Sequence, residues 1–321
     1  MIPQDLLLVK LLKLILSVIP EIQLPDRVGA PYTYSPAVMA CCFVIMVAKK
    51  LSVRGLHALL INTEDYQAQS LRATIPFPKG EVPHRRTFDR RLKNWQLSVQ
   101  LYMLSATDFM IAKFKLGVAR LAVDNRMFPA FGAIWHQKDV TAGVIPEKLR
   151  NVDTTAGWGV SAYRKWVFGH GLDVFVTVGK IIVPVLAVGR SLTIRGNTAL
   201  KQITHLLPKV KKGIAAADSE YDDQVLAQLL KPTGRNLHTA KKKNPKATPK
   251  SKTYQRRKIT VEPFYERFLL AFHARGKLDR KGPQAWPYLV TCCFLYQLMV
   301  IYCLMQGKQD PIQITHLIRM L

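Results

Sequence analysis

Three acidic residues stand where a carboxylate could do chemistry. Asp124 follows the apolar run Leu121–Val123, and Asp218 follows the small and apolar run Gly213–Ala217, so each acid comes where a buried strand is predicted to end. Glu262 lies early in a helical pattern that follows a run dense in Lys and Arg. Carboxylate oxygens are ligands that Mg²⁺ prefers. We therefore expect Asp124, Asp218 and Glu262 to converge and to hold divalent metal for phosphoryl transfer on DNA.

The chemistry expected of such a site is phosphodiester cleavage. It requires an activated water or 3′-hydroxyl, and it requires charge to be neutralised on an in-line transition state. Two Mg²⁺ ions about 4 Å apart perform both tasks. Three neighbouring acids would normally raise one another's pKa values, but bound cations reverse that effect and keep all three ionised. We expect two Mg²⁺ ions here, with Mn²⁺ as a substitute ion.

Each acid has a competing interpretation. Asp124 could be an ordinary turn residue at the end of a strand. Glu266 stands one helical turn beyond Glu262 on the same face and could replace it. The acids that compete with Asp218 are Glu220, Asp222 and Asp223. The last two are typical of a helix N-terminus, where the helix dipole favours negative charge.

The composition indicates a polyanionic partner. Lys and Arg number 47 against 21 Asp and Glu, which gives a net charge of +26 and an isoelectric point near 10.1. The expected ligand of such a protein is nucleic acid or an anionic membrane surface. Apolar residues make up 49% of the chain, too many for a disordered basic protein, so the charge should coat a folded core.

The cysteines and the apolar stretches bear on the compartment. All five cysteines lie in apolar sequence without a CxxC spacing, which favours small buried side chains in a reducing compartment over zinc or disulfides. Leu6–Ile19 carries Lys10 and Lys13 and does not resemble a signal peptide, and Pro36–Val47 is too short to span a membrane. Trp286–Met305 is long enough, but its polar residues favour a buried helix. We expect a cytoplasmic, nucleoid-associated protein with no membrane partner.

Residues 1–112 are predicted to form a helical, DNA-binding N-terminal region. The turn-rich stretch 76–83 precedes a basic amphipathic helix at 84–93, in which Phe88 and Leu92 lie on a different face from the cations. Such a helix could lie along a DNA groove or its phosphates, or its basic face could simply be solvated. The DNA contacts predicted on it are Arg85, Arg86, Arg90 and Arg91.

The sequence after residue 112 predicts an α/β domain over 113–306, with a tail at 307–321. A meander of strands comes first and alternating helices and strands follow, which fits a mixed sheet flanked by helices on both faces. Pro184 makes the last strand of the meander an edge strand. The strands of the meander are predicted at 118–123, 165–170, 172–178 and 181–188. A flexible basic loop, 239–258, interrupts the pattern before the Glu262 helix.

Over about residues 80–300 the chain resembles a DDE transposase of a bacterial insertion sequence. The matching segments are His84–Leu92, Val123-Asp124, Gly132–His136, Trp166–Gly171, Ala217–Asp222 and Arg257–Arg267. The resemblance implies a ribonuclease H-like catalytic core. In such a core the first Asp ends the first core strand, the second Asp ends the fourth, and the Glu lies on a late helix. By that resemblance Asp124, Asp218 and Glu262 are the catalytic residues and metal ligands.

The resemblance also implies an activity and its partners. It implies a Mg²⁺-dependent endonuclease that binds the inverted-repeat ends of its element in double-stranded DNA and joins the cut 3′ ends to target DNA. A dimer is expected in the DNA complex. The alternative is an inactive or domesticated derivative that only binds DNA.

Further DNA contacts are expected around the Glu262 helix and within the long irregular segment from Asn125 to about Tyr163. Related enzymes often carry a Tyr and an Arg before the Glu and a Lys after it. Tyr254 and Arg257 fit the upstream pair, whereas Leu269 stands where the Lys would fall, so Arg267 is the expected substitute. Trp135 and His136 could stack on an extruded base or could form a buried structural pair. The other predicted phosphate contacts are Arg256, Lys241, Lys242 and Lys243.

Overall fold

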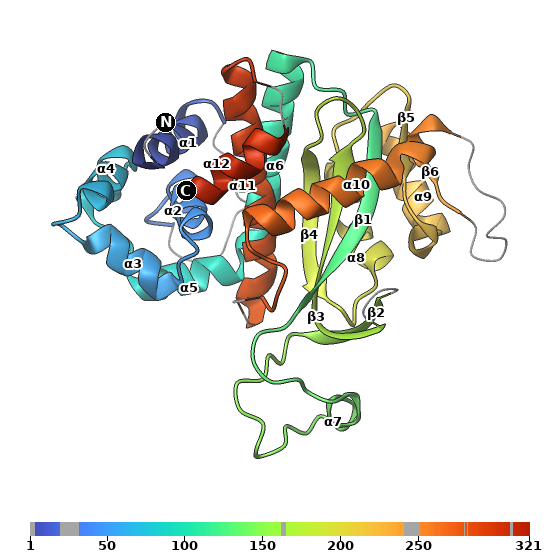
Figure 1. Ribbon diagram of the computed structural model, residues 1–321, viewed down its shortest axis with the longest axis horizontal. Coiled ribbons are helices and arrows are strands. Elements are labelled where there is room, and N and C mark those ends of the chain that lie inside the picture. The colour runs from blue at the N-terminus through green and yellow to red at the C-terminus, as the bar shows by residue number, and fades with distance from the viewer. Residues whose placement is uncertain are drawn as a thin grey trace.

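The structure is a computed structural model, and it describes residues 4–19, 32–161, 165–240, 251–278, 280, 282–308 and 311–321. The described elements before residue 115 are helices, and they form one end of the molecule (Figure 1). Their bounds are α1 (Gln4–Ser17), α2 (Pro36–Ala48), α3 (Val53–Ile61), α4 (Tyr66–Thr74), the short 3₁₀ turn η1 (Pro78–Gly80), α5 (Arg85–Lys93) and α6 (Trp95–Phe114). The sequence Ser35-Pro36 is typical of an N-cap followed by a first-turn proline. The structure confirms this start of α2, because Ser35 Oγ accepts the Val38 N–H at 3.3 Å and Pro36 occupies the first turn.

A mixed sheet forms the other half of the molecule. Its strands are β1 (Arg120–Pro129), β2 (Gly157–Ser161), β3 (Lys165–Thr177), β4 (Pro184–Ser191), β5 (Gly213–Ala216) and β6 (Arg235–His238). β3 pairs antiparallel with β1, β2 and β4, whereas β1, β5 and β6 run parallel. The sheet order is β2-β3-β1-β5-β6, with β4 pairing β3 alone, so the prediction of an edge strand at Pro184 is confirmed. A mixed sheet in this order is consistent with the ribonuclease H-like core that the resemblance implies.

Two predicted strand boundaries are wrong. β1 does not end at Asp124 but continues to Pro129, because each of its residues from Leu121 onward has a partner on β3. The predicted strands at 165–170 and 172–178 are one strand, β3. The glycines of this strand allow close approach rather than a turn, since a Cβ on Gly169 would lie 2.0 Å from the Phe128 carbonyl oxygen.

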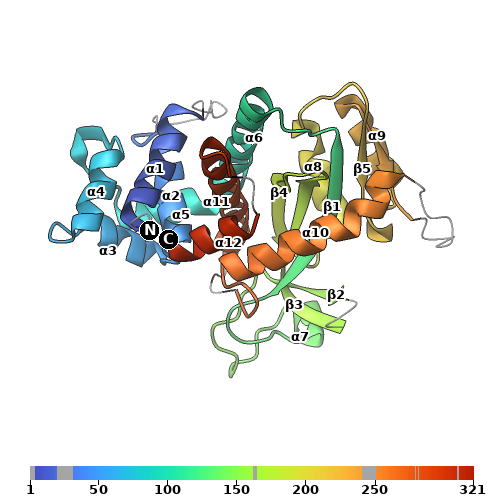
Figure 2. The same ribbon diagram turned by 45° about the horizontal axis from the view of Figure 1, so that its top comes forward.

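Helices cover both faces of the sheet (Figures 1 and 2). α10 (Lys252–Ala271) crosses one face, where Phe268 packs edge-on against Phe128 of β1 with ring centroids 6.3 Å apart. α8 (Gly196–Ile203) and α9 (Gln224–Leu230) cover the other face. α6 and α11 (Ala285–Met305) pack against β4, so they join the sheet to the N-terminal helices.

The helix that carries Glu262 differs from its prediction in start and in phase. α10 begins at Lys252, where Ser251 Oγ accepts the Tyr254 N–H at 3.2 Å, so the end of the predicted basic loop is helical. The apolar residues Ile259, Phe264, Phe268 and Leu270 predict its buried side from the sequence, but Ile259 is 66% exposed and Leu270 is 38% exposed. The buried stripe instead runs through Val261, Phe264, Tyr265 and Phe268, the spacing of one helical face.

The apolar helix near the C-terminus is buried inside the protein. α11 is long and apolar enough to cross a membrane, and 89% of its apolar window is buried, which confirms the interpretation of Trp286–Met305 as a buried helix. The bent pair of α2 and α3 would pass the same length and composition test only as one span broken by a 108° bend. Gln297 of α11 donates its Nε2 hydrogens to the Pro184 carbonyl at 2.7 Å and to the Met103 carbonyl at 3.0 Å, tying α11 to β4 and α6.

All five cysteines are free and buried, as expected. One apolar core joins the N-terminal helices to the sheet, and the predicted boundary at residue 112 falls inside α6. The predicted tail 307–321 contains α12 (Pro311–Met320), which packs against α10 and α11.

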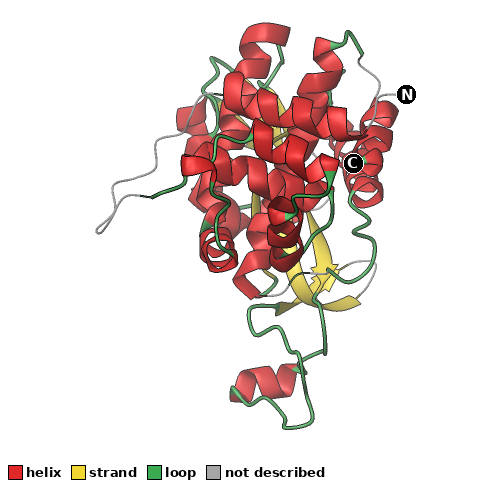
Figure 3. Ribbon diagram, turned by 90° about the vertical axis from the view of Figure 1, so that its left-hand side faces the viewer, coloured by secondary structure: helices red, strands yellow, loops and turns green. Residues whose placement is uncertain are grey.

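One segment projects from this body. The chain between β1 and β2 forms an arm with one short helix, α7 (Gln137–Ala142), that stands clear of the sheet (Figure 3). A small satellite core fixes its base, formed by Ala130, Ala156 and Phe168 with Trp135 and Trp158 packed against them.

Candidate active site

Asp124 lies where two parallel strands part. The pairing of β1 with β5 ends at Ala122 opposite Ala216, while Asp124 remains paired with Val174 of β3 on its other side. Continuing the β1–β5 register by two residues places Asp218 opposite Asp124. The two carboxylates are close enough for the charge of Asp218 to act on Asp124.

Asp218 caps the turn that follows β5. The 3₁₀ turn η3 (Ser219–Tyr221) begins after it, and the Asp218 Oδ1 accepts the Glu220 N–H at 2.9 Å. Glu220 is held in turn by Asn125 of β1, whose Nδ2 donates to Glu220 Oε2 at 2.8 Å. This turn therefore brings another acid, Glu220, to the middle of β1, where Asn125 follows Asp124.

The charge of Asp218 acts on the two neighbouring acids, Asp124 and Glu220. Burial raises the pKa of Asp124 from its ordinary 3.8 to about 7, the Arg257 guanidinium opposes this rise, and the charges of Asp218 and Glu220 add to it. Burial also raises the pKa of Glu220, against the opposing effect of Arg190. Negative charge is thus crowded at this point of a strongly basic protein, an arrangement typical of a cation site.

α10 is fixed over Asp124 by two side chains. Arg257 Nη1 lies 3.3 Å from Asp124 Oδ2. About two turns further along, the buried Tyr265 hydroxyl lies 3.0 Å from the Asp124 carbonyl oxygen and 2.8 Å from the Leu172 carbonyl oxygen. Tyr265 belongs to a segment that carries the family resemblance, but its sequence gave no sign of this contact.

Glu262 does not join the other two predicted ligands in a preformed site. Its side chain is 54% exposed and pairs with Lys258 at 3.7 Å. Within the described ranges, no three His, Cys, Asp or Glu side chains lie close enough to hold a metal ion. The reason lies in the helix phase: Val261 and Tyr265 face the sheet, and Glu262 is turned about 100° from Val261.

A buried polar network lies on the α8 side of the sheet, and none of its residues was predicted from the sequence. Asp173 of β3, fully buried, accepts hydrogen bonds from Arg190 Nε at 2.5 Å and from the Tyr221 hydroxyl at 2.6 Å. The signal was an acid inside the otherwise apolar alternation of 172–178. A charge at such a position is costly unless it is paired, so a buried partner could have been inferred.

The basic helix α5 confirms its predicted faces with one exception. Phe88 and Leu92 are fully buried, and Arg85, Arg86 and Arg90 are exposed. Arg91 is only 8% exposed, and its guanidinium carbon lies 3.7 Å from the centre of the Tyr32 ring. The predicted DNA contact of Arg91 is therefore not available in this structure, because its cation stacks on an aromatic ring inside the fold.

Trp135 and His136 belong to the projecting arm. Trp135 packs against the satellite core and donates its Nε1 hydrogen to the Val144 carbonyl at 2.9 Å, and its own carbonyl accepts the Trp158 Nε1 hydrogen at 2.8 Å. His136 is exposed and precedes α7. The pair is therefore not buried as the alternative to base stacking required, since His136 is exposed and Trp135 is only partly buried, and base stacking stays a prediction.

The remaining predicted contacts divide between surface and interior. Arg256 is exposed and Tyr254 half-buried on α10, and the cluster Lys241–Lys243 lies outside the described residues. Arg267 lies beside the buried Tyr296, where it opposes the burial that raises the pKa of that hydroxyl to about 12. Five residues on a helix place Arg267 about 140° from Glu262, so the two side chains lie on different faces of α10, and its substitution for the missing Lys stays a prediction.

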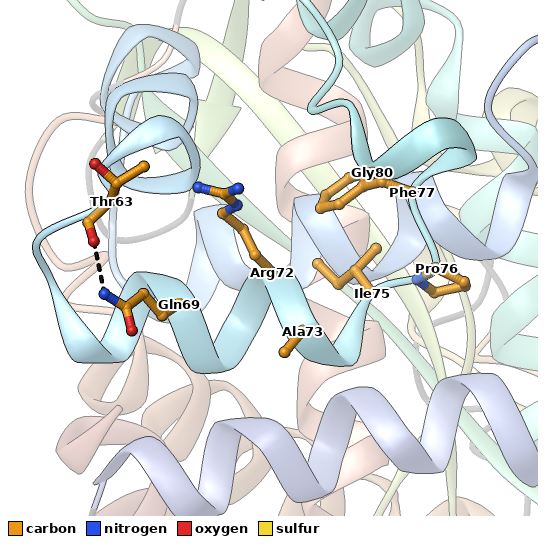
Figure 4. A pocket seen from close by; sticks show the side chains of 8 residues that line it. All are labelled: Thr63, Gln69, Arg72, Ala73, Ile75, Pro76, Phe77 and Gly80. Carbon is orange, nitrogen blue, oxygen red and sulfur yellow. Dashed lines mark hydrogen bonds between the residues drawn. The ribbon is translucent and has the colours of Figure 1, made fainter.

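A cavity lies away from these acids. It has a volume of about 470 Å³ and opens between α4 and η1, at the end of the N-terminal helices (Figure 4). Its lining residues are Thr63, Gln69, Arg72, Ala73, Ile75, Pro76, Phe77 and Gly80. None of the candidate acids lines it, so cavity size does not locate the candidate site.

Comparison with known proteins gave one structural likeness. No protein-family model matches the sequence, and no curated protein matches it. Among solved structures, the chain is similar to the piggyBac transposase in a cryo-EM synaptic complex with hairpin DNA, with a TM-score of 0.43 and 11% identity over 98% of this chain and 79% of that chain. A likeness at this level carries no argument about the chemistry of the site.

Proposed function

We propose that this protein is a DDE transposase with a ribonuclease H-like core. It binds the inverted-repeat ends of an insertion sequence and catalyses metal-dependent cleavage and strand transfer. The observation that carries the proposal is the pair Asp124 and Asp218, which stand just past the point where β1 and β5 stop pairing. The basic charge of the chain and the Arg257 contact with Asp124 support a polyanionic substrate at the same place.

The acids fit Mg²⁺ by the chemistry of their donors. Mg²⁺ in phosphoryl-transfer sites is commonly held by one or two carboxylates together with substrate phosphates, so Asp124 and Asp218 suffice as a starting pair. When bound, two ions would activate the attacking oxygen and neutralise the transition-state charge. Cation binding would also favour the ionised form of Asp124, which burial and its acidic neighbours disfavour.

Two glutamates are candidates for the third carboxylate ligand of the proposed Mg²⁺ site. Glu262 is the proposed ligand by family resemblance, and it would have to turn toward Asp124 from its exposed position on α10. Glu220 is favoured by position, since its charge acts on Asp124 and its carboxylate accepts a hydrogen bond from Asn125, the next residue of β1.

The chain's own residues would do the binding and positioning. Exposed Arg85, Arg86 and Arg90 on α5 would contact phosphates of the DNA ends, while Arg257 would meet the phosphate nearest the acids. We place this activity in a domain at 113–306, preceded by a DNA-binding region at 1–112, and we expect a dimer on DNA in the nucleoid.

The test is a cleavage assay on duplexes that carry the DNA flanking this reading frame. We expect Mg²⁺-dependent cleavage at short inverted repeats, and in Asp218→Asn we expect a loss of more than about 100-fold with end binding nearly unchanged. Asp139→Asn is the matched control, because it makes the same change on α7 of the projecting arm. Cleavage by Asp218→Asn at the wild-type rate would refute the assignment.

A second candidate function is a transposase-derived protein that only binds DNA. The exposed position of Glu262 favours it, because the three family acids do not form a preformed cluster. Such a protein would bind the same duplexes in a salt-dependent way and would cleave none of them with either Mg²⁺ or Mn²⁺.

A further inference from the structure

Strand pairing alone does not fix the carboxylate of Asp218. The β1–β5 ladder ends at Ala216, and the last backbone bond that ties this strand to the sheet is the Ala217 N–H to the His238 carbonyl, at 3.0 Å. Asp218 therefore stands one residue beyond the sheet, at the start of a three-residue turn. Its distance from Asp124 depends on what holds that turn.

The turn is held at its far end by a buried side chain. Tyr221 closes η3 and is fully buried, and its hydroxyl donates to Asp173 Oδ1 at 2.6 Å. Asp173 is fixed in turn by Arg190 of β4, whose Nε donates to Asp173 Oδ2 at 2.5 Å. The guanidinium of Arg190 also donates from Nη1 to the Ile194 carbonyl, which anchors it to the chain that leads into α8.

The side chains of Asp173 and Tyr221 are tightly packed against the start of α8. A Cβ on Gly196, the first residue of α8, would lie 2.4 Å from Asp173 Oδ1 and 3.0 Å from the Tyr221 hydroxyl. On the other side of the turn, Asn125 holds Glu220 at 2.8 Å. The turn that carries Asp218 is thus tied to β1 through Glu220 and to β3 and β4 through Tyr221.

We propose that Tyr221, held by Asp173 and Arg190, is a positioning residue that sets Asp218 against Asp124 and so determines the affinity of the site for divalent metal. This inference rests on the proposed function. Groups that orient metal ligands typically change metal affinity or activity by about 10–100-fold when they are removed. Tyr221 needs no contact with DNA or metal for this effect, since it acts through the backbone of the turn.

The test is Tyr221→Phe, which removes one hydroxyl and keeps the ring. We expect the Mg²⁺ concentration for half-maximal cleavage to rise about tenfold, with DNA-end binding unchanged. In the absence of DNA, the Mg²⁺ concentration that half-saturates the rise in melting temperature should increase by the same factor. Tyr102→Phe is the matched control, because it removes a buried hydroxyl on α6 and should leave both Mg²⁺ dependences unchanged.

Gly196→Ala provides an independent perturbation of the same network. Its Cβ would lie too close to both Asp173 and the Tyr221 hydroxyl, so Gly196→Ala should raise the Mg²⁺ concentration for half-maximal cleavage, as Tyr221→Phe does. In the double variant this concentration should rise by less than the product of the two single effects. A variant that melts at lower temperature but keeps the wild-type Mg²⁺ dependence would overturn the inference. If wild-type protein is stabilised by Mg²⁺ but cleaves no DNA, the proposed function fails, and the thermal readout still decides the role of Tyr221.

Discussion

The pKa of Asp124 leads to a stability prediction that requires no DNA. In the folded protein Asp124 holds its proton up to about pH 7, whereas its ordinary pKa is 3.8. Stability therefore falls as pH rises from about 4 to about 7, and the loss is complete above pH 7, where the folded protein carries an ionised, crowded carboxylate. Asn resembles the protonated acid and cannot ionise, so Asp124→Asn should be more stable than wild type at pH 8 in EDTA.

The size of the effect follows from the same values. About three pKa units at 1.36 kcal/mol each give an upper bound of about 4 kcal/mol. The Asp124 side chain is 24% exposed, so water reduces the expected gain to about 1–2 kcal/mol. For a chain of this length that corresponds to a rise in melting temperature of about 2–4 °C.

The assay is thermal melting of wild type and Asp124→Asn at pH 5 and pH 8, with EDTA or with Mg²⁺. We expect the variant's advantage to appear at pH 8, to shrink at pH 5, and to be reduced by Mg²⁺, which stabilises only the wild-type carboxylate. Asp139→Asn on α7 serves as the control and should show no such pattern. An Asp124→Asn variant that is less stable than wild type at pH 8, or equally favoured at both pH values, would refute the reasoning.

Two further predictions concern the third acid and the basic helix. If Glu262 completes the site, Glu262→Gln should abolish cleavage and Glu220→Gln should leave most of it; the reverse result, measured in the same assay, would assign Glu220. Because Arg86 and Arg90 are exposed, replacing both by Ala should weaken DNA binding and lower the slope of log affinity against log salt by about 2, whereas Arg91→Ala should lower the melting temperature through its lost stacking on an aromatic ring. An unchanged slope in the double variant, from titrations at several salt concentrations, would exclude α5 from the DNA interface.

The positions of Asp124 and Asp218 could be anticipated because both follow apolar runs, and such runs predict buried strands. The edge position of β4 followed from Pro184, which lacks a backbone donor. The extension of β1 past Asp124 could not be anticipated, since Asp124, Asn125 and Arg126 interrupt the apolar run. These residues remain in the strand because β3 pairs with them, and pairing with a distant segment leaves no local mark.

Side chains of the same type differ in burial because of contacts with residues distant in the sequence. Arg90 and Arg91 are neighbours, yet Arg91 is buried because Tyr32 lies beneath it. The phase of α10, which turns Glu262 to the surface, is set by Tyr265 bonding to carbonyls on β1 and β3. Tertiary contacts of this kind decide the geometry of a site after local pattern has decided its elements.

The central claim is that Asp124 and Asp218 hold a divalent cation together. It is tested most directly by anomalous diffraction from crystals of the wild-type protein soaked in Mn²⁺. We expect a Mn²⁺ peak within direct coordination distance, about 2.0–2.6 Å, of carboxylate oxygens of both residues. A peak that touches neither residue, or no peak at saturating Mn²⁺ with both carboxylates ordered, would contradict the claim.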